Sequence, residues 1–217
     1  MKILLGVISI LLIFISVVSI DKYFKKEGLF IWLSLATVIA NIIVCKTIEV
    51  VGVTTSLGNI MFASNFLATD ILSEKYGKKE AKKGVLMAFV FMIIFVVITQ
   101  LSLLFIPASE DAAHEAMKIL FSLNLRVSIA SLLLSFVSNN LDVFIFHKLA
   151  EKYPDKLWLR NNVATIVANC SENYFFSFIA FLGIYDITTI ISIATTSSIL
   201  EMIIAVCDTP FLYLAKK

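Results

Sequence analysis

Four carboxylates lie inside long apolar stretches of this 217-residue chain: Asp70, Asp142, Glu172 and Asp208. A carboxylate near the middle of a lipid bilayer costs about 2.5–3.5 kcal/mol on insertion scales, so it normally faces a partner or a polar cavity. In such a place it can accept hydrogen bonds from a substrate or carry a proton. These acids therefore mark candidate functional positions, and the apolar stretches around them must position them.

Polar residues recur at helical intervals in segments 126–146, 162–182 and 187–214, which places each of these sets on one face of a helix, and segments 29–51 and 54–72 offer further polar residues. The sets are Asn41 and Cys45; Asn65 and Asp70; Ser128, Ser131, Ser135, Asn139 and Asp142; Asn162, Thr165, Asn169, Glu172 and Asn173; and Ser197, Glu201 and Asp208. We expect five helices to turn these faces toward one shared polar cavity. For any single serine or asparagine, the alternative role is a hydrogen bond between helices, at about 0.6 kcal/mol.

The composition indicates a polytopic helical membrane protein. Hydrophobic residues make up 59% of the chain and charged residues only 16%, whereas a soluble domain has roughly 25% charged residues. The mean hydropathy is +0.95, and the apolar runs have about the length that a helix needs to cross a bilayer. We predict an all-α fold with transmembrane helices at 3–20, 29–51, 54–72, 84–106, 126–146, 162–182 and 187–214.

Lysine and arginine predict the orientation, because short cytoplasmic loops carry an excess of them. With the lysine cluster at 75–83 in the cytoplasm, alternation places 22–26, 148–160 and 216–217 on the same side, which accounts for 14 of the 18 basic residues. The N-terminus is then outside and the C-terminus is cytoplasmic. This arrangement requires the weakly hydrophobic segment 54–72 to cross the membrane rather than re-enter it, so much of that helix must be shielded from lipid.

The sequence lacks the signature motifs of several classes of function. There is no glycine-rich phosphate loop, no H-E-x-x-H helix and no nucleophile elbow, so we do not expect an enzyme. The three cysteines, Cys45, Cys170 and Cys207, lack the spacing of a metal site. The sequence has no polybasic arm of the kind that binds nucleic acid. We therefore expect no metal, no cofactor and no nucleic-acid partner.

Several sequence elements resemble those of the queuosine-precursor transporter family, also called vitamin uptake transporters. They are FLATDILSEKYGKKEAKK after Asn65, Arg126, LDVFIFHKL around Asp142, LWLRN at 157–161, ANCSENYFFSFIAF around Glu172 and DTPFLYL from Asp208. The resemblance implies uptake of deazaguanine bases or queuine across the cytoplasmic (inner) membrane for tRNA modification. It also implies a six-helix core at 29–217, similar to the substrate-binding subunits of energy-coupling-factor transporters, after an extra helix within 1–28.

The resemblance also suggests which residues bind the substrate and which have a gating or topological role. The first set is Asn41, Asn65, Asn139, Asp142, Asn169, Glu172 and Asp208, and the second is Asp70, Glu74, Arg126 and Arg160. A carboxylate accepts two adjacent N–H donors of a guanine-like base, and an asparagine amide both donates and accepts. We expect Glu172 or Asp142 to bind the donor edge. Asn169 or Asn139 then binds the acceptors, while Asp70 is an inner-gate or loop-fixing residue.

The energy source and the oligomeric state stay open at this point. The expected partners are a small planar deazapurine and the lipid bilayer. The chain could transport alone, with or without ion coupling, or it could be the substrate-binding subunit of an importer driven by a separate ATPase module. Assembly into a homo-oligomer is a further alternative that the sequence leaves open. A membrane enzyme or a non-transporting scaffold is the alternative of a different class, and binding of a deazaguanine by the purified protein separates it from a transporter.

Overall fold

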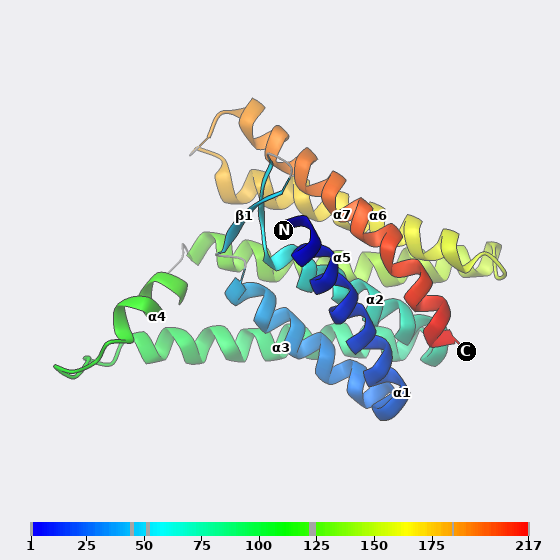
Figure 1. Cartoon of the computed structure of the whole chain (residues 1–217), viewed down its shortest axis with the longest axis horizontal. Helices are drawn as coiled ribbons and strands as arrows, with labels where there is room; N and C mark the ends of the chain where they lie inside the picture. The colour runs from blue at the N-terminus through cyan, green and yellow to red at the C-terminus, as the bar shows by residue number, and fades with distance from the viewer. Residues whose placement is uncertain (1, 44–45, 51–52, 122–124, 184, 217) are drawn as a thin grey trace.

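The computed structural model of the chain describes residues 2–43, 46–50, 53–121, 125–183 and 185–216. Within these residues the fold has seven helices and one two-stranded hairpin. In chain order they are α1 (Lys2–Ile43), β1 (Thr47–Val50), β2 (Val53–Ser56), α2 (Gly58–Tyr76), α3 (Lys78–Leu103), α4 (His114–Phe121), α5 (Leu125–Lys152), α6 (Leu157–Phe181) and α7 (Ile187–Lys216). The long helices form one bundle, with the C-terminus and the α5–α6 turn toward one end and α4 toward the other (Figure 1).

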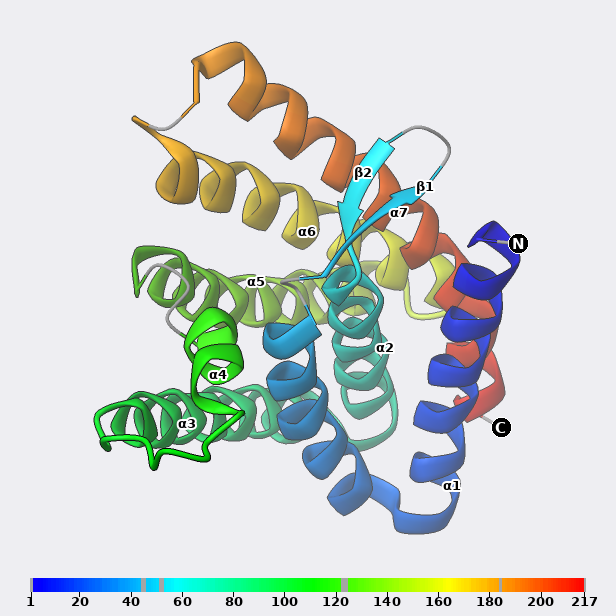
Figure 2. The ribbon, with the colours of Figure 1, turned by 60° about the vertical axis from the view of Figure 1, so that its left-hand side comes forward.

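Helix α1 contains two of the predicted spans, joined by a sharp turn at Lys25. The backbone of Lys25 has φ 55° and ψ −146°, outside the helical region, and the two halves form the arms of a V (Figure 2). Gly28 makes this turn sterically accessible, because a Cβ at that position would lie 2.6 Å from Cβ of Phe24 and 2.7 Å from Cγ2 of Ile20. The charged segment therefore separates two helical halves, as predicted.

Four helical segments of the described chain are long and apolar enough to cross a membrane. They are Leu4–Ile43, which includes both halves of α1, Lys78–Leu103, Ile129–Lys152 and Ile187–Lys216. Helices α2 and α6 are not among them, in keeping with their polar content. This set of helices is that of a multi-pass membrane protein.

Helix α2 occupies the centre of the bundle, where it contacts α1, α3, α5 and α7. Fourteen of its 19 residues are buried, including the polar residues Asn65, Thr69 and Asp70. By contrast, only five of the 26 residues of α3 are buried. The prediction that segment 54–72 must be shielded is confirmed, because neighbouring helices surround it.

The prediction that segments 29–51 and 54–72 are helical throughout is wrong where the two segments meet. Helix α1 ends at Ile43, and Thr47–Val50 pairs antiparallel with Val53–Ser56, with Thr47 opposite Ser56. Both strands are rich in Thr, Val and Ile, whose branched Cβ atoms favour extended backbone. The N–H of Leu57 donates to the carbonyl of Lys46 at 2.9 Å, which closes the base of the hairpin.

A second departure is α4, which lies in a segment predicted as a loop. Oδ1 of Asp111 accepts hydrogen bonds from the N–H groups of Ala113 (2.7 Å) and His114 (3.1 Å). Such a cap satisfies backbone donors that a helix start leaves free. Nε2 of Gln100 donates to the carbonyl of Phe121 at 2.6 Å. Helix α4 is therefore fastened to the end of α3.

Candidate functional site

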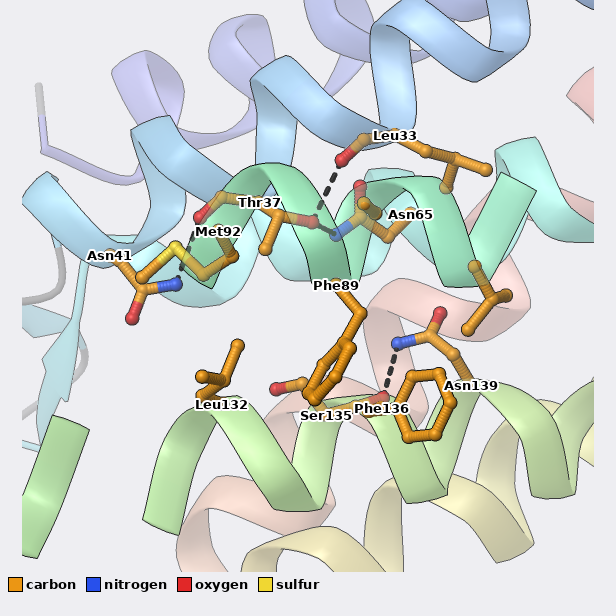
Figure 3. A pocket seen from close by; sticks show the side chains of 12 residues that line it. Leu33, Thr37, Asn41, Asn65, Phe89, Met92, Leu132, Ser135, Phe136 and Asn139 are labelled. Carbon is orange, nitrogen blue, oxygen red and sulfur yellow. Dashed lines mark hydrogen bonds between the residues drawn. The ribbon is translucent and has the colours of Figure 1, made fainter. Parts of the chain in front are cut away.

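A small, partly open cavity lies between α1, α2, α3 and α5 (Figure 3). The side chains that line it are Leu33, Thr37, Asn41, Asn65, Val85, Ala88, Phe89, Met92, Leu132, Ser135, Phe136 and Asn139. Seven of them are apolar and five are polar. Small-molecule sites are typically lined in this way, with a mainly apolar surface and a few polar groups that orient the ligand. We refer to this cavity as the pocket.

The asparagine amides of the pocket use their N–H groups within the protein. Nδ2 of Asn65 donates to Oγ1 of Thr37 at 3.0 Å, and Nδ2 of Asn41 donates to the Thr37 carbonyl at 2.9 Å. Nδ2 of Asn139 donates to the Ser135 carbonyl at 2.7 Å. The buried Oδ1 atoms of Asn65 and Asn139 have no hydrogen-bond partner among the described residues. A buried acceptor without a donor costs about 1–3 kcal/mol, so both oxygens would gain a hydrogen bond if the amides turned toward a ligand in the pocket.

Two phenylalanines form an aromatic wall of the pocket. The ring centroids of Phe89 on α3 and Phe136 on α5 are 4.3 Å apart, with the ring planes inclined by 37°. Both rings lie beside Ser135 and Asn139 (Figure 3). Aromatic faces pack well against other flat rings. The pocket thus combines a planar apolar surface with free amide acceptors.

Glu172 is connected to the pocket through Ser135. Oγ of Ser135 donates to Oε1 of Glu172 at 2.6 Å, so the acid stands behind the α5 wall of the pocket. A second acid, Glu201 on α7, is close enough to Glu172 for an electrostatic interaction. Oε2 of Glu201 accepts from Nδ2 of Asn173 at 2.7 Å. Helices α6 and α7 thus place two carboxyl groups behind the α5 wall of the pocket.

Several charged segments meet at one end of the bundle, which we call the basic end. Oε2 of Glu74 lies 2.9 Å from Nη2 of Arg160, and Oε1 of Glu74 lies 2.7 Å from Nζ of Lys216. Lys75 forms a salt bridge with Asp21 near the α1 turn. These contacts join the α1 turn to the end of α2, the start of α6 and the end of α7. The prediction that the basic segments share one side of the bundle is therefore confirmed.

Three aspartates from three helices meet between the pocket and the basic end, and we call them the acid cluster. The side chains of Asp70, Asp142 and Asp208 are all 0% exposed. Oγ1 of Thr165 on α6 lies 3.2 Å from Oδ1 of Asp142 and 3.5 Å from Oδ2 of Asp70. Nδ2 of Asn161 donates to Oδ1 of Asp208 at 2.7 Å. Helix α6 thus contributes neutral polar groups to a site that is otherwise acidic.

The expected single cavity is therefore divided into layers. Of the predicted substrate-binding residues, Asn41, Asn65 and Asn139 line the pocket, whereas Asp142 and Asp208 belong to the acid cluster. Glu172 touches the pocket wall, and Asn169 is buried in α6 outside the lining. Residues of one polar helix face lie at different depths along the bundle. Their spacing in the sequence does not show which of them reach the pocket.

The predicted gating set is also divided. Glu74 and Arg160 pair at the basic end, and Asp70 lies one helical turn from Glu74 on α2. Helix α5 begins at Leu125, but the side chain of Arg126 lies outside the described residues.

Sequence reasoning did not single out Thr37, Phe89 or Phe136, and it placed Thr165 and Glu201 on polar helix faces without assigning them to the binding or gating set. A signal existed for Thr37, which precedes Asn41 by four residues. Helical neighbours at this spacing share a face. No comparable signal marks the two phenylalanines, because apolar residues surround both in the sequence.

Known proteins place this chain among transporters. No solved structure matches it. The "Probable queuosine precursor transporter" of Bacillus subtilis (strain 168) is 38% identical over 206 residues, which cover 94% of this chain and 90% of that protein. A family model described as "Putative vitamin uptake transporter" matches residues 56–215, from the end of β2 to the last turn of α7. These are transporters and not enzymes, and the chain belongs to this vitamin uptake transporter family.

Proposed function

We propose that the protein imports a queuosine precursor, either a deazaguanine base or queuine, across the cytoplasmic membrane for tRNA modification. Family membership and the name of the Bacillus subtilis relative support the substrate class. The observation that carries the proposal is the pocket, where free amide oxygens stand beside an aromatic wall. A deazaguanine offers a flat ring system with N–H donors on one edge, which matches both features.

In this proposal the substrate lies between the asparagines and the phenylalanines of the pocket. Oδ1 of Asn65 and Oδ1 of Asn139 accept hydrogen bonds from the donor edge of the base. Asn41 lies one turn beyond Thr37 and contacts the opposite edge. Glu172 acts through the Ser135 hydroxyl, which it holds at 2.6 Å, and keeps the pocket attractive to N–H donors.

The proposed topology has seven transmembrane helices: the two halves of α1, α2, α3, α5, α6 and α7. The first half of α1 precedes a six-helix core at 29–217. The basic end faces the cytoplasm, because lysine and arginine are retained on that side, and the N-terminus is outside. Asn65 precedes Tyr76 by 11 residues, so the pocket is about 16 Å from the basic end at 1.5 Å per helical residue.

The basic end acts as the cytoplasmic gate of the transporter. Glu74 binds Arg160 and Lys216 at the same time, which holds the ends of α2, α6 and α7 together below the pocket. Release of the substrate to the cytoplasm then requires these ion pairs to separate. Asp70, one turn above Glu74, is placed between this gate and the pocket.

Rescue of tRNA queuosine tests the proposal. The gene is expressed in a bacterial host that lacks its own queuosine synthesis and uptake, and cyano-deazaguanine, aminomethyl-deazaguanine or queuine is supplied one at a time. At least one of them should restore queuosine in tRNA. If none does while the protein is present in the membrane, the proposal is wrong. Dependence of rescue on a co-purifying ATPase module would instead favour a substrate-binding subunit.

The same assay tests the two acids predicted to bind the base. Glu172→Gln keeps the shape of the side chain but removes its charge, and Asp142→Asn does the same in the acid cluster. Both variants should reduce uptake at normal expression. Normal transport by both variants would remove these acids from the mechanism and leave the pocket amides alone as the binding groups.

A further inference from the structure

We propose that the acid cluster of Asp70, Asp142 and Asp208 binds protons that move with the substrate, so that the proton gradient drives import. This inference rests on the proposed transport function and adds an energy source to it. It is carried by the charge balance around the cluster, by unpaired buried oxygens and by the position of the cluster along the bundle.

The buried charges around the cluster do not balance. Asp70 interacts electrostatically with Asp142 on α5, Asp208 on α7 and Arg160 on α6. Arg160 is already paired with Glu74, whose other oxygen binds Lys216. A buried carboxylate without a counter-charge is strongly unfavourable, and close carboxylates cannot all be ionised. At least one of the three aspartates must therefore hold a proton.

The hydrogen bonds lead to the same conclusion independently. In the part of the chain that the structure describes, Oδ1 of Asp70, Oδ2 of Asp208 and Oδ1 of Asn161 are buried without a hydrogen-bond partner. Asn161 is 0% exposed, and its Nδ2 already donates to Oδ1 of Asp208. These oxygens lack a donor, while Nε and Nη2 of Arg160, which interacts electrostatically with Asp70, are buried donors without a hydrogen-bond acceptor. A carboxyl O–H on Asp70 or Asp208 supplies a donor for these oxygens, whereas an ionised carboxylate supplies none.

The other charged groups of the surrounding helices do not neutralise the cluster. Apart from Lys2, the charged residues of α1 and α3 lie at the basic end, where Asp21 pairs with Lys75 and Glu80 with Lys26. His147 on α5 interacts electrostatically with Lys78, Arg160 and Glu74 at the basic end. Among the described residues, no group of three or more ligating side chains is arranged to hold a metal ion. A proton neutralises a buried carboxylate without any further ligand.

The position of the cluster links a bound proton to both the pocket and the gate. On α5, Asp142 follows Asn139 by three residues, and on α2, Asp70 precedes Glu74 by four, so each pair shares a helix face. Arg160 attracts both Asp70 and Glu74. When Asp70 is protonated, Arg160 stays with Glu74 and the basic end is closed. When Asp70 is ionised, it competes with Glu74 for Arg160 and weakens the closed state.

The cycle balances without a further reactant. A carboxylate of the cluster takes one proton from the outer aqueous side and becomes a carboxyl group. The basic end then stays closed while the substrate enters the pocket. Loss of that proton toward the cytoplasm regenerates the carboxylate and draws Arg160 from Glu74. One substrate and at least one proton then cross in the same direction.

Proteoliposomes containing the full chain test this inference with labelled 7-cyano-7-deazaguanine, an uncharged probe. Uptake is measured with and without an inside-alkaline gradient, and a trapped pH-sensitive dye reports protons that enter with the probe. Counterflow, the exchange of labelled for unlabelled probe, is measured without a gradient. The wild-type protein should concentrate the probe only with the gradient and should acidify the lumen. Asp208→Asn should lose accumulation and acidification but retain counterflow, whereas Asp70→Asn, which cannot compete for Arg160, should lose counterflow as well.

Asp155→Asn is the matched control, because Asp155 is an exposed carboxylate in the α5–α6 turn, and it should behave as wild type. A monodisperse size-exclusion profile establishes that each variant is folded. Gradient-independent uptake by the wild-type protein, or gradient-driven accumulation by Asp70→Asn, would overturn proton coupling while leaving transport intact. Absence of wild-type counterflow would overturn the proposed function and the inference with it. Loss of counterflow in folded Asp208→Asn would assign this acid to substrate binding and overturn its role in coupling.

Discussion

The pocket and the basic end both lie along α2, but their polar groups are bonded in different ways. At the basic end, Glu74 engages both of its oxygens, one with Arg160 and one with Lys216. In the pocket, Asn65 and Asn139 each keep a buried oxygen that no described residue satisfies. Buried polar groups are nearly always bonded in folded proteins, so an exception requires an explanation. The comparison teaches that the two regions differ in what stays without a hydrogen bond among the described residues: acceptor oxygens in the pocket, and the donors Nε and Nη2 of Arg160 at the basic end.

Breaking the basic end should have the largest effect on stability. Arg160 is 5% exposed, and its guanidinium lies 5.1 Å from the ring centroid of Phe146. Arg160→Met should lower the free energy of unfolding by about 3 kcal/mol, because it leaves a partly buried Glu74 with one partner fewer. Thermal unfolding in detergent measures the loss as a lower Tm. The double variant Glu74→Gln, Arg160→Met should recover part of it, and an unchanged Tm in Arg160→Met would show that the network is not structural.

Substitutions in the pocket should have the opposite effect. They should weaken substrate binding and leave the free energy of unfolding almost unchanged. Asn65→Ala and Asn139→Ala should each weaken substrate binding by about 1–3 kcal/mol, or roughly 5- to 150-fold, because an acceptor for the base is removed. The dissociation constant of the purified protein measures this. Asn140→Ala is the control, since Asn140 bonds to the Phe136 carbonyl and does not line the pocket. Equal losses at all three positions would contradict the assignment.

A smaller effect is expected at the aromatic wall. Phe89→Leu keeps an apolar side chain but removes the face that packs on the base, at about 0.5–1.5 kcal/mol or roughly 2- to 12-fold in affinity. Phe95 is a suitable control position, because its ring packs on Phe121 of α4 at 5.9 Å rather than in the pocket. If Phe89→Leu and Phe95→Leu bind equally well, stacking does not contribute to recognition.

The smallest effect concerns a carboxylate outside both regions. The hydroxyl and the N–H of Thr189 donate to Asp186 at 2.6 and 3.0 Å, and these bonds lower the pKa of Asp186. Because the folded pKa is below the unfolded one, this stabilisation is present above the unfolded pKa and is lost as pH falls through the folded pKa. Asp186→Asn should lower the Tm slightly at neutral pH, and the difference should shrink below about pH 4. A difference that is constant with pH would exclude the carboxylate as its cause.

The sequence predicts the framework of this protein better than its site. Apolar runs and basic clusters indicate the helices and the end they share, because lipid exposure and loop charge follow simple rules. The same rules identify α2 as a helix in need of shielding, since its polar residues are incompatible with lipid on all sides. They fail at β1 and β2, because hydropathy alone does not distinguish a short strand from the end of a helix.

The site is only partly predictable, because it depends on how helices are rotated and staggered against one another. Spacing places Asn139 and Asp142 on one face, but it does not reveal that one lines the pocket and the other meets Asp70. The chain has 18 phenylalanines, and most of their positions are equally suited to lipid and to a ligand. Only the packing of α3 on α5 identifies Phe89 and Phe136 as a pair.

The hairpin has a mechanical consequence. It ties the end of α1 to the start of α2, and at Gly84 a Cβ would lie 2.8 Å from Cδ1 of Leu33 and 3.0 Å from Cδ1 of Leu72, so α3 is locked against both. The second half of α1, α2 and α3 should move as one rigid block. Spin labels at the exposed positions Leu35 and Leu86 would then keep a constant separation through the cycle, while a label at Ile203 on α7 would report every movement relative to that block.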